Sequence, residues 1–138
     1  MSVLALSAEA RSTAGILLLT LVAVEGGGTF LLALTRGRKP ATDFQRTFAR
    51  AGHAHAGVLV ILALVSQILL DATTLTGLPE TLARSGVAAA AILMPAGFFL
   101  SSSGRDATEP NRLLVLVPIG AVSLALGMVS LGIGLLTT

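Results

Sequence analysis

The chain has 138 residues, of which 54% are hydrophobic and only 12% are charged. A soluble domain usually carries about 25% charged residues, so this composition excludes an ordinary soluble globule and a disordered chain. The net charge of +2 provides no basic face for nucleic acid, and the absence of Cys excludes disulfides and thiolate metal sites. By length we expect one domain, over residues 1–138.

Four apolar stretches follow one another along the chain, at about 13–34, 51–70, 82–102 and 113–136. Each has roughly 20 residues or more, which as a helix spans the roughly 30 Å hydrocarbon core of a lipid bilayer. A cleaved signal peptide explains the first stretch less well, because the run is long and Glu9 weakens the basic region before it. The sequence therefore predicts an all-α, up-down bundle of four transmembrane helices.

Lys and Arg are distributed unevenly over the predicted loops. The loops after the first and third stretches hold Arg36, Arg38, Lys39, Arg46, Arg50, Arg105 and Arg112, whereas the opposite side has only Arg11 and Arg84. Because basic loops stay in the cytoplasm, we expect both of these loops to be cytoplasmic and both termini to lie outside. The expected location is the bacterial inner (plasma) membrane.

The two basic loops resemble each other. Residues 37–46 and 104–112 share, with one gap, a Gly-Arg pair, an Ala-Thr pair, an acid and a closing Arg. The offset of about half the chain suggests duplication of a helical hairpin around an axis along the membrane normal. The alternative is chance similarity between two short polar loops.

Small residues form a seam along the fourth stretch. They recur at 3-4-3-4 spacing and share one helical face: Gly120, Ser123, Gly127, Ser130 and Gly134. Helices in lipid associate by close packing at small residues, so another helix must lie against this seam. Gly86, Ala90 and Gly97 of the third stretch offer a matching surface, but the sequence leaves open whether the partner belongs to the same protomer.

Glu25 lies near the middle of the first stretch, close to the expected bilayer centre. A carboxylate there costs about 2.5 kcal/mol or more, so it needs a partner, water or a proton. The next three residues are glycines, which allow a neighbouring backbone or a ligand to approach closely. This pattern indicates a proton site, a ligand anchor or a cation site; the alternative is a protonated carboxyl bonded to a neighbouring helix.

Polar residues recur along one face of the second helix at spacings of four and three. With Val60 and Leu64 between them, they are Arg46, Arg50, His53, Gly57, Gln67 and Asp71. This face should point toward a cavity or a subunit interface. Arg46, Arg50 and Asp71 can instead be interfacial helix ends, an explanation that does not cover His53 and Gln67.

His53 and His55 are the only histidines. On a helix, residues i and i+2 point about 200° apart, so these two imidazoles cannot chelate one metal ion. Haem is one candidate cofactor, with His53 and His55 as its only candidate histidine ligands, and a bis-histidine haem would need a second protomer. The alternative is a pair of interfacial histidines that bond to loop carbonyls or lipid headgroups.

Helix geometry decides whether Glu25 and His53 meet. Glu25 lies about 15 Å below the cytoplasmic end of the first helix. His53 lies about 9 Å deep if the second helix enters the membrane near Thr47, and about 6 Å shallower if it enters at Ala51. Glu25 and His53 can touch directly only if the second helix enters near Thr47. A water-bridged pair fits either point of entry. Such a pair would form a proton relay or a polar pocket open to the cytoplasm.

Residues 44–57, which read FQRTFARAGHAHAG, resemble small uncharacterised bacterial four-span proteins. The layout, with outward termini and a basic loop leading into an Arg-rich second helix, is similar to the MAPEG family of glutathione-linked membrane enzymes. That resemblance implies a trimer with a cytoplasmic-facing thiol-cofactor site, although Ala and Val stand here where that family has Asn and Glu. The His-Ala-His-Ala-Gly run is also similar to one helix of haem–copper oxidase relatives, which implies haem ligation.

Our leading functional hypothesis is a homo-oligomeric membrane protein with an intramembrane polar cavity. It would bind a small ligand, a proton or a cofactor through Glu25, His53, Gln67 and His55. Arg46 and Arg50 would add to the site from its cytoplasmic side.

Two alternatives stay open. One is a MAPEG-like enzyme with a cytoplasmic-side site around Arg46, Arg50 and His53, although no Ser-His-Asp, P-loop or HExxH pattern supports it. The other is a structural subunit of a membrane complex, which the small-residue seam of the fourth stretch suggests.

Overall fold

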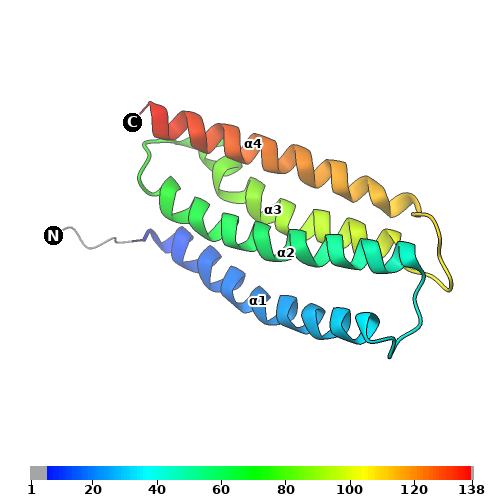
Figure 1. The fold of residues 1–138 in the computed structure, drawn as a ribbon. Helices are drawn as coiled ribbons and strands as arrows, with labels where there is room; N and C mark the ends of the chain where they lie inside the picture. The colour runs from blue at the N-terminus through cyan, green and yellow to red at the C-terminus, as the bar shows by residue number, and fades with distance from the viewer. Residues whose placement is uncertain (1–5, 138) are drawn as a thin grey trace.

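Four long helices joined by short loops make up the fold (Figure 1). The computed structural model describes residues 6–137. The helices are α1 (Ala8–Thr35), α2 (Asp43–Leu70), α3 (Gly77–Ser101) and α4 (Leu116–Leu136), with a 3₁₀ turn, η1 (Arg112–Val115), before α4. Each helix, the fourth together with η1, is long and apolar enough to cross a membrane. The predicted all-α four-helix bundle is confirmed, and the chain has the build of a multi-pass membrane protein.

Polar caps start the first two helices well before their apolar stretches. α2 begins at Asp43 because Thr42 and Gln45 form a capping box, in which each side chain accepts a hydrogen bond from the other residue's backbone N–H, both at 3.1 Å. At α1, the hydroxyl of Ser7 accepts from the N–H of Ala10 at 3.1 Å. The early start of α2 places His53 about 15 Å along its axis from Asp43.

The seam on α4 packs against α3 within the protomer. A β-carbon built on Gly86 of α3 would lie 2.7 Å from the carbonyl oxygen of Ser123 and 2.9 Å from the Cα of Gly127. The Ser123 hydroxyl donates to the Gly86 carbonyl at 3.0 Å. At the far end of the seam, Gly134 faces Leu75 in the loop before α3, where an added β-carbon would meet the Leu75 side chain at 2.5 Å. The structure thus identifies the partner that the sequence left open.

α1 lies at the edge of the bundle and packs mainly against α2 (Figure 1). Only 6% of its span is buried, against 44% for α3. Leu17 is buried in the apolar core with Leu59 and Val60 of α2. The two hairpins therefore differ in packing, and the duplication suggested by their loops stays a prediction.

The two loops at the far end of the bundle touch each other. The Thr42 hydroxyl donates to the carbonyl of Ala107 at 2.5 Å. The side-chain amide of Gln45 donates to the carbonyls of Ser102 and Gly104, at 3.2 and 2.8 Å. The residues that cap α2 therefore also fix the α3–α4 loop, and this end of the bundle is tied together next to the histidines.

Candidate functional site

The imidazole of His53 lies against α1 in space that two glycines leave open. A β-carbon built on Gly27 would lie 3.3 Å from Nδ1 of His53, and one on Gly28 would lie 3.5 Å from Cε1 and 3.7 Å from Nε2. Larger side chains at these positions would crowd the ring. Of the glycines after Glu25, Gly27 therefore has the clearest physical role, since it leaves room for the imidazole beside the α1 backbone.

Glu25 and His53 line one cavity of about 360 Å³. The rest of its wall comes from α1, with Leu21, Val24, Gly28, Thr29 and Leu32. Within residues 6–137, no hydrogen bond or ion pair joins the side chain of Glu25 or of His53 to another residue. The structure therefore brings these two sequence-predicted residues together and leaves both side chains available to a third group.

Glu25 is exposed on the protomer, although it lies in mid-span. A carboxylate that faces hydrocarbon costs about 2.5–3.5 kcal/mol, and a desolvated donor or acceptor without a hydrogen bond costs about 1–3 kcal/mol. Glu25 and His53 can lower these costs only with a group from outside the described residues. A proton, water, a ligand or a second copy of the chain would serve.

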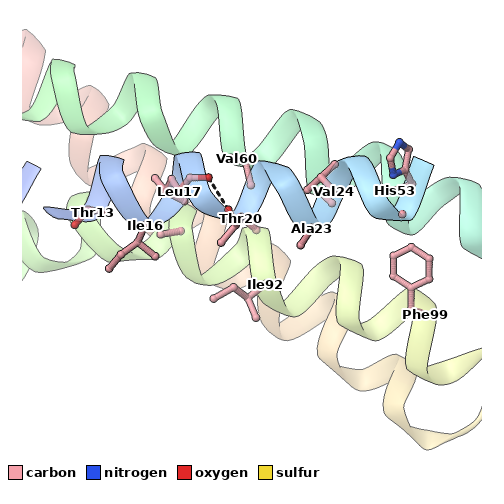
Figure 2. Close-up of a pocket in the computed structure, with 14 residues that line it drawn as sticks. Thr13, Ile16, Leu17, Thr20, Ala23, Val24, His53, Val60, Ile92 and Phe99 are labelled. Carbon is pink, nitrogen blue, oxygen red and sulfur yellow. Dashed lines mark hydrogen bonds between the residues drawn. The ribbon is translucent and has the colours of Figure 1, made fainter. Parts of the chain in front are cut away.

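A second cavity, of about 330 Å³, lies between α1, α2 and α3 (Figure 2). Figure 2 shows that it extends from Thr13 at one end to His53 and Phe99 at the other. Its wall is apolar except for His53 and two threonines, and the Thr20 hydroxyl already donates to the Leu17 carbonyl at 2.6 Å. We call this space the apolar cavity.

His53 stands between the two cavities. Gly27 lines the apolar cavity and Gly28 lines the cavity of Glu25, and a β-carbon on either glycine would lie within 4 Å of the imidazole. Nδ1 is the ring nitrogen nearer Gly27, and Nε2 is nearer Gly28. One imidazole therefore borders both cavities.

His55 faces α3 instead of α1. Its Nδ1 donates to the Ala51 carbonyl at 2.7 Å, and its ring lies 4.9 Å from the ring of Phe98, centroid to centroid. The two histidines have different neighbours, as the helical spacing predicts. His55 already has a backbone partner and an aromatic contact, which matches the alternative of a histidine bonded to a carbonyl.

Gln67 lies about 21 Å from His53 along α2 and is fully buried. Its Nε2 donates to the Arg84 carbonyl at 2.9 Å, and its Oε1 accepts from the Arg84 guanidinium at 3.4 Å. We call the group around this guanidinium the Arg84 network; it consists of Ser7, Gln67, Asp71, Glu80 and Arg84. Gln67 belongs to this network and lines neither cavity of His53.

The Arg84 network links three helices at the end of the bundle opposite the histidines. The Arg84 guanidinium lies 3.2 Å from the Glu80 carboxylate and 3.6 Å from that of Asp71. Asp71 in turn accepts from the backbone N–H and the hydroxyl of Ser7, at 2.7 and 3.0 Å. Its groups satisfy one another, so its role is structural.

Arg46 and Arg50 lie on the turns of α2 before His53. The Arg46 guanidinium pairs with the Asp43 carboxylate at 3.1 Å, and Asp43 is almost fully exposed. Arg50 is exposed. Neither arginine lines a cavity with His53, so their side chains are placed as interfacial charges near the loops.

Among residues 6–137, no group of three or more His, Asp or Glu side chains is placed to hold a metal ion. Because His53 faces α1 and His55 faces α3, the two cannot ligate one haem iron within a protomer. Both ring nitrogens of His53 are unpaired, whereas His55 has only Nε2 unpaired because its Nδ1 bonds to the Ala51 carbonyl.

No family model, curated protein or solved structure matches the chain.

Sequence reasoning missed two features of the site region. A sequence pattern could have predicted the Arg84 network. Gln67 and Asp71 at the end of α2 form one i,i+4 pair, and Glu80 and Arg84 near the start of α3 form another at the neighbouring helix end. No sequence pattern could have predicted the apolar cavity or the place of Phe99 in its wall. A space between three helices depends on how the helices pack, and the residue spacing within one helix does not determine it.

Proposed function

We propose that the chain is a multi-pass protein of the bacterial inner membrane whose site at Glu25 and His53 binds a small polar ligand, a proton or a cofactor. The excess of Lys and Arg in the α1–α2 and α3–α4 loops supports a cytoplasmic location for both loops. In this orientation the termini lie outside, and the cavity of Glu25 lies within the membrane toward the cytoplasmic side.

The observation that carries the proposal is the pairing of two unsatisfied polar side chains at one cavity. Several polar side chains of the spans are satisfied within the described bundle: Ser66, Gln67 and Ser123 all donate hydrogen bonds to carbonyls. The ionisable side chains of Glu25 and His53 have no such partner, although they lie on different helices and face the same space. Polar groups that are costly in lipid and unpaired by the protein are typical of proton and ligand sites.

Histidine NMR tests whether the two residues act as one site. Because the chain has only two histidines, ¹⁵N-labelled histidine gives one ring-nitrogen pair from His53 and one from His55. In lipid nanodiscs, we expect Glu25→Gln to shift the His53 signals and to leave those of His55 unchanged, since His55 faces α3. Unchanged His53 signals would contradict a shared site.

Ligand retention supplies the second test. An absorption spectrum and a native mass spectrum of detergent-purified protein reveal any bound molecule and its stoichiometry. A ligand that is present in the wild type and lost in both Glu25→Gln and His53→Ala supports the proposal. A Soret band lost in His53→Ala identifies that ligand as haem, and a ligand retained by both variants places its site elsewhere.

We also propose that the chain forms a homo-oligomer through α1. Its span is the least buried of the four, and it carries the exposed carboxyl of Glu25. A second copy that covers this helix would remove Glu25 from lipid. The native mass spectrum tests this directly, and a protomer that stays monomeric across detergents would contradict it.

A further inference from the structure

We infer that the apolar cavity binds a membrane quinone or quinol, with its head at His53 and its tail along α1. This inference rests on the function proposed above, since it assigns a ligand class to the same imidazole. A quinone has a flat, neutral head with carbonyl or hydroxyl oxygens and a long apolar tail, and each of these properties has a counterpart in the cavity.

The shape and the lining of the cavity fit an apolar chain. Its α1 wall runs from Thr13 to Gly27, which is about 21 Å along the helix axis. Its α3 wall includes Ala88, Ala91 and Ile92. An apolar space of this kind offers water too few partners to hold it, whereas the surrounding bilayer supplies molecules with apolar tails.

The end of the cavity at His53 fits a flat, hydrogen-bonding head. His53 is the one lining side chain with unpaired ring nitrogens, and Nδ1 is the nitrogen on the side of Gly27. The ring of Phe99 lies at the same end (Figure 2). A quinone ring can pack against Phe99 in an offset aromatic contact while one oxygen bonds to the imidazole.

The charges near this end favour a neutral head over a phosphate. Among the described residues that line the cavity there is no Lys or Arg. The imidazole also lines the cavity of Glu25, whose carboxylate would repel an anion. A phospholipid head would therefore lack a cationic partner at His53, whereas a carbonyl or a hydroxyl would not need one.

The position of the imidazole adds a consequence for protons. With a head oxygen bonded to one ring nitrogen, the other is left for a partner in the cavity of Glu25, which the same imidazole lines. Imidazole can accept a proton at one nitrogen and release it from the other. The quinone head, His53 and Glu25 would then form a hydrogen-bonded path between the two cavities.

The test uses decylubiquinone and the ¹⁵N-histidine protein in nanodiscs of dioleoylphosphatidylcholine. We expect saturable binding of one quinone per protomer and a shift of the His53 signals, while the His55 signals do not shift. His53→Ala should weaken binding about ten-fold, the value of one hydrogen bond. Binding that is not saturable, or that shifts neither histidine, would overturn the inference.

A cavity-filling variant provides the matched comparison. Ala23→Phe places a ring in the apolar cavity from the exposed side of α1, whereas Ala125→Phe makes the same change on an exposed position of α4, away from it. We expect Ala23→Phe to lose at least about ten-fold in quinone affinity and Ala125→Phe to keep the wild-type value. Equal affinities, or a copurified phospholipid that decylubiquinone cannot displace, would overturn the inference.

The same samples separate this inference from the proposed function. If Glu25→Gln shifts His53 without quinone but quinone does not bind, the inference fails and the shared site stands. If Glu25→Gln leaves His53 unchanged, the proposed function fails, whatever the quinone does.

Discussion

Gly86 of α3 and Gly127 of α4 face each other so closely that a β-carbon on Gly86 would lie 2.9 Å from the Cα of Gly127. Gly86→Ala must push the two helices apart, because the atoms in its way are backbone atoms. We expect it to destabilise the protein by about 1–3 kcal/mol. Thermal unfolding followed by circular dichroism in detergent measures the change.

Gly132→Ala is the matched control for this substitution. Gly132 also lies on α4, but a β-carbon there meets nothing within 4 Å. Because Ala favours helix over Gly by up to about 1 kcal/mol, the control should be neutral or stabilising. Equal losses in the two variants would show that glycine matters here for the helix and not for the α3–α4 contact.

Gly27→Leu should displace the imidazole of His53. The added side chain needs the space in which Nδ1 now lies, since a β-carbon alone would come within 3.3 Å of it. We expect the His53 ring signals to move while those of His55 stay. Gly26→Leu changes the neighbouring residue, where nothing lies within 4 Å, and should leave both histidines unchanged. A larger shift from Gly26→Leu would contradict the placement of His53.

Arg84→Met should weaken the end of the bundle opposite the histidines. The variant keeps most of the side-chain volume but removes the donors to Gln67, Asp71 and Glu80. Gln67 is fully buried and the Asp71 side chain is 13% exposed, and leaving such acceptors without this donor costs about 1–3 kcal/mol. Arg46→Met, at an exposed pair worth at most about 1 kcal/mol, is the control, and a loss there as large as at Arg84 would contradict the structure.

Thr42→Val removes the hydroxyl that caps α2 and contacts the Ala107 carbonyl. We expect a loss of about 1 kcal/mol and faster hydrogen exchange in the first turn of α2. Thr42→Ser keeps the hydroxyl and should stay close to the wild type. If the valine variant exchanges as slowly as the serine variant, the hydroxyl does not hold this end of the bundle.

Single cysteines can establish the orientation, because the chain has none of its own. Thr108→Cys, in the α3–α4 loop, and Thr74→Cys, in the α2–α3 loop, are both at exposed positions. We expect an impermeant thiol reagent applied outside intact cells to label Thr74→Cys only. Labelling of Thr108→Cys alone would reverse the proposed orientation.

The number and order of the helices could be predicted from apolar length, and their starts could not be read from hydropathy alone. The second helix begins at Asp43 instead of near residue 51. The apolar stretch starts only after the charged residues, whereas the hydrogen-bonded helix already includes them. The Thr-x-x-Gln pattern at Thr42 and Gln45 was the signal for the earlier start.

The site was partly predictable for a similar reason. Glu25 and His53 stand out because each is costly in lipid, and the glycines beside Glu25 indicated a close approach. Gln67 shares a helical face with His53, but the face is long enough for its two ends to meet different neighbours: α1 near His53, and Arg84 of α3 near Gln67. The spacing of residues along a helix shows which of them share a face. It does not show which neighbouring helix that face meets at each position along the axis.

The peripheral position of α1 has a consequence for how a ligand arrives. α3 and α4 interlock without α1, which nevertheless forms a wall of both cavities beside His53. Moving α1 aside costs mainly its contacts with α2, including those of Leu17, and leaves the α3–α4 contact in place, so an opening of the apolar cavity toward the bilayer would start at α1. A ligand would then enter by lateral diffusion in the membrane, and its partition into lipid, more than its concentration in water, would set how often the cavity is filled.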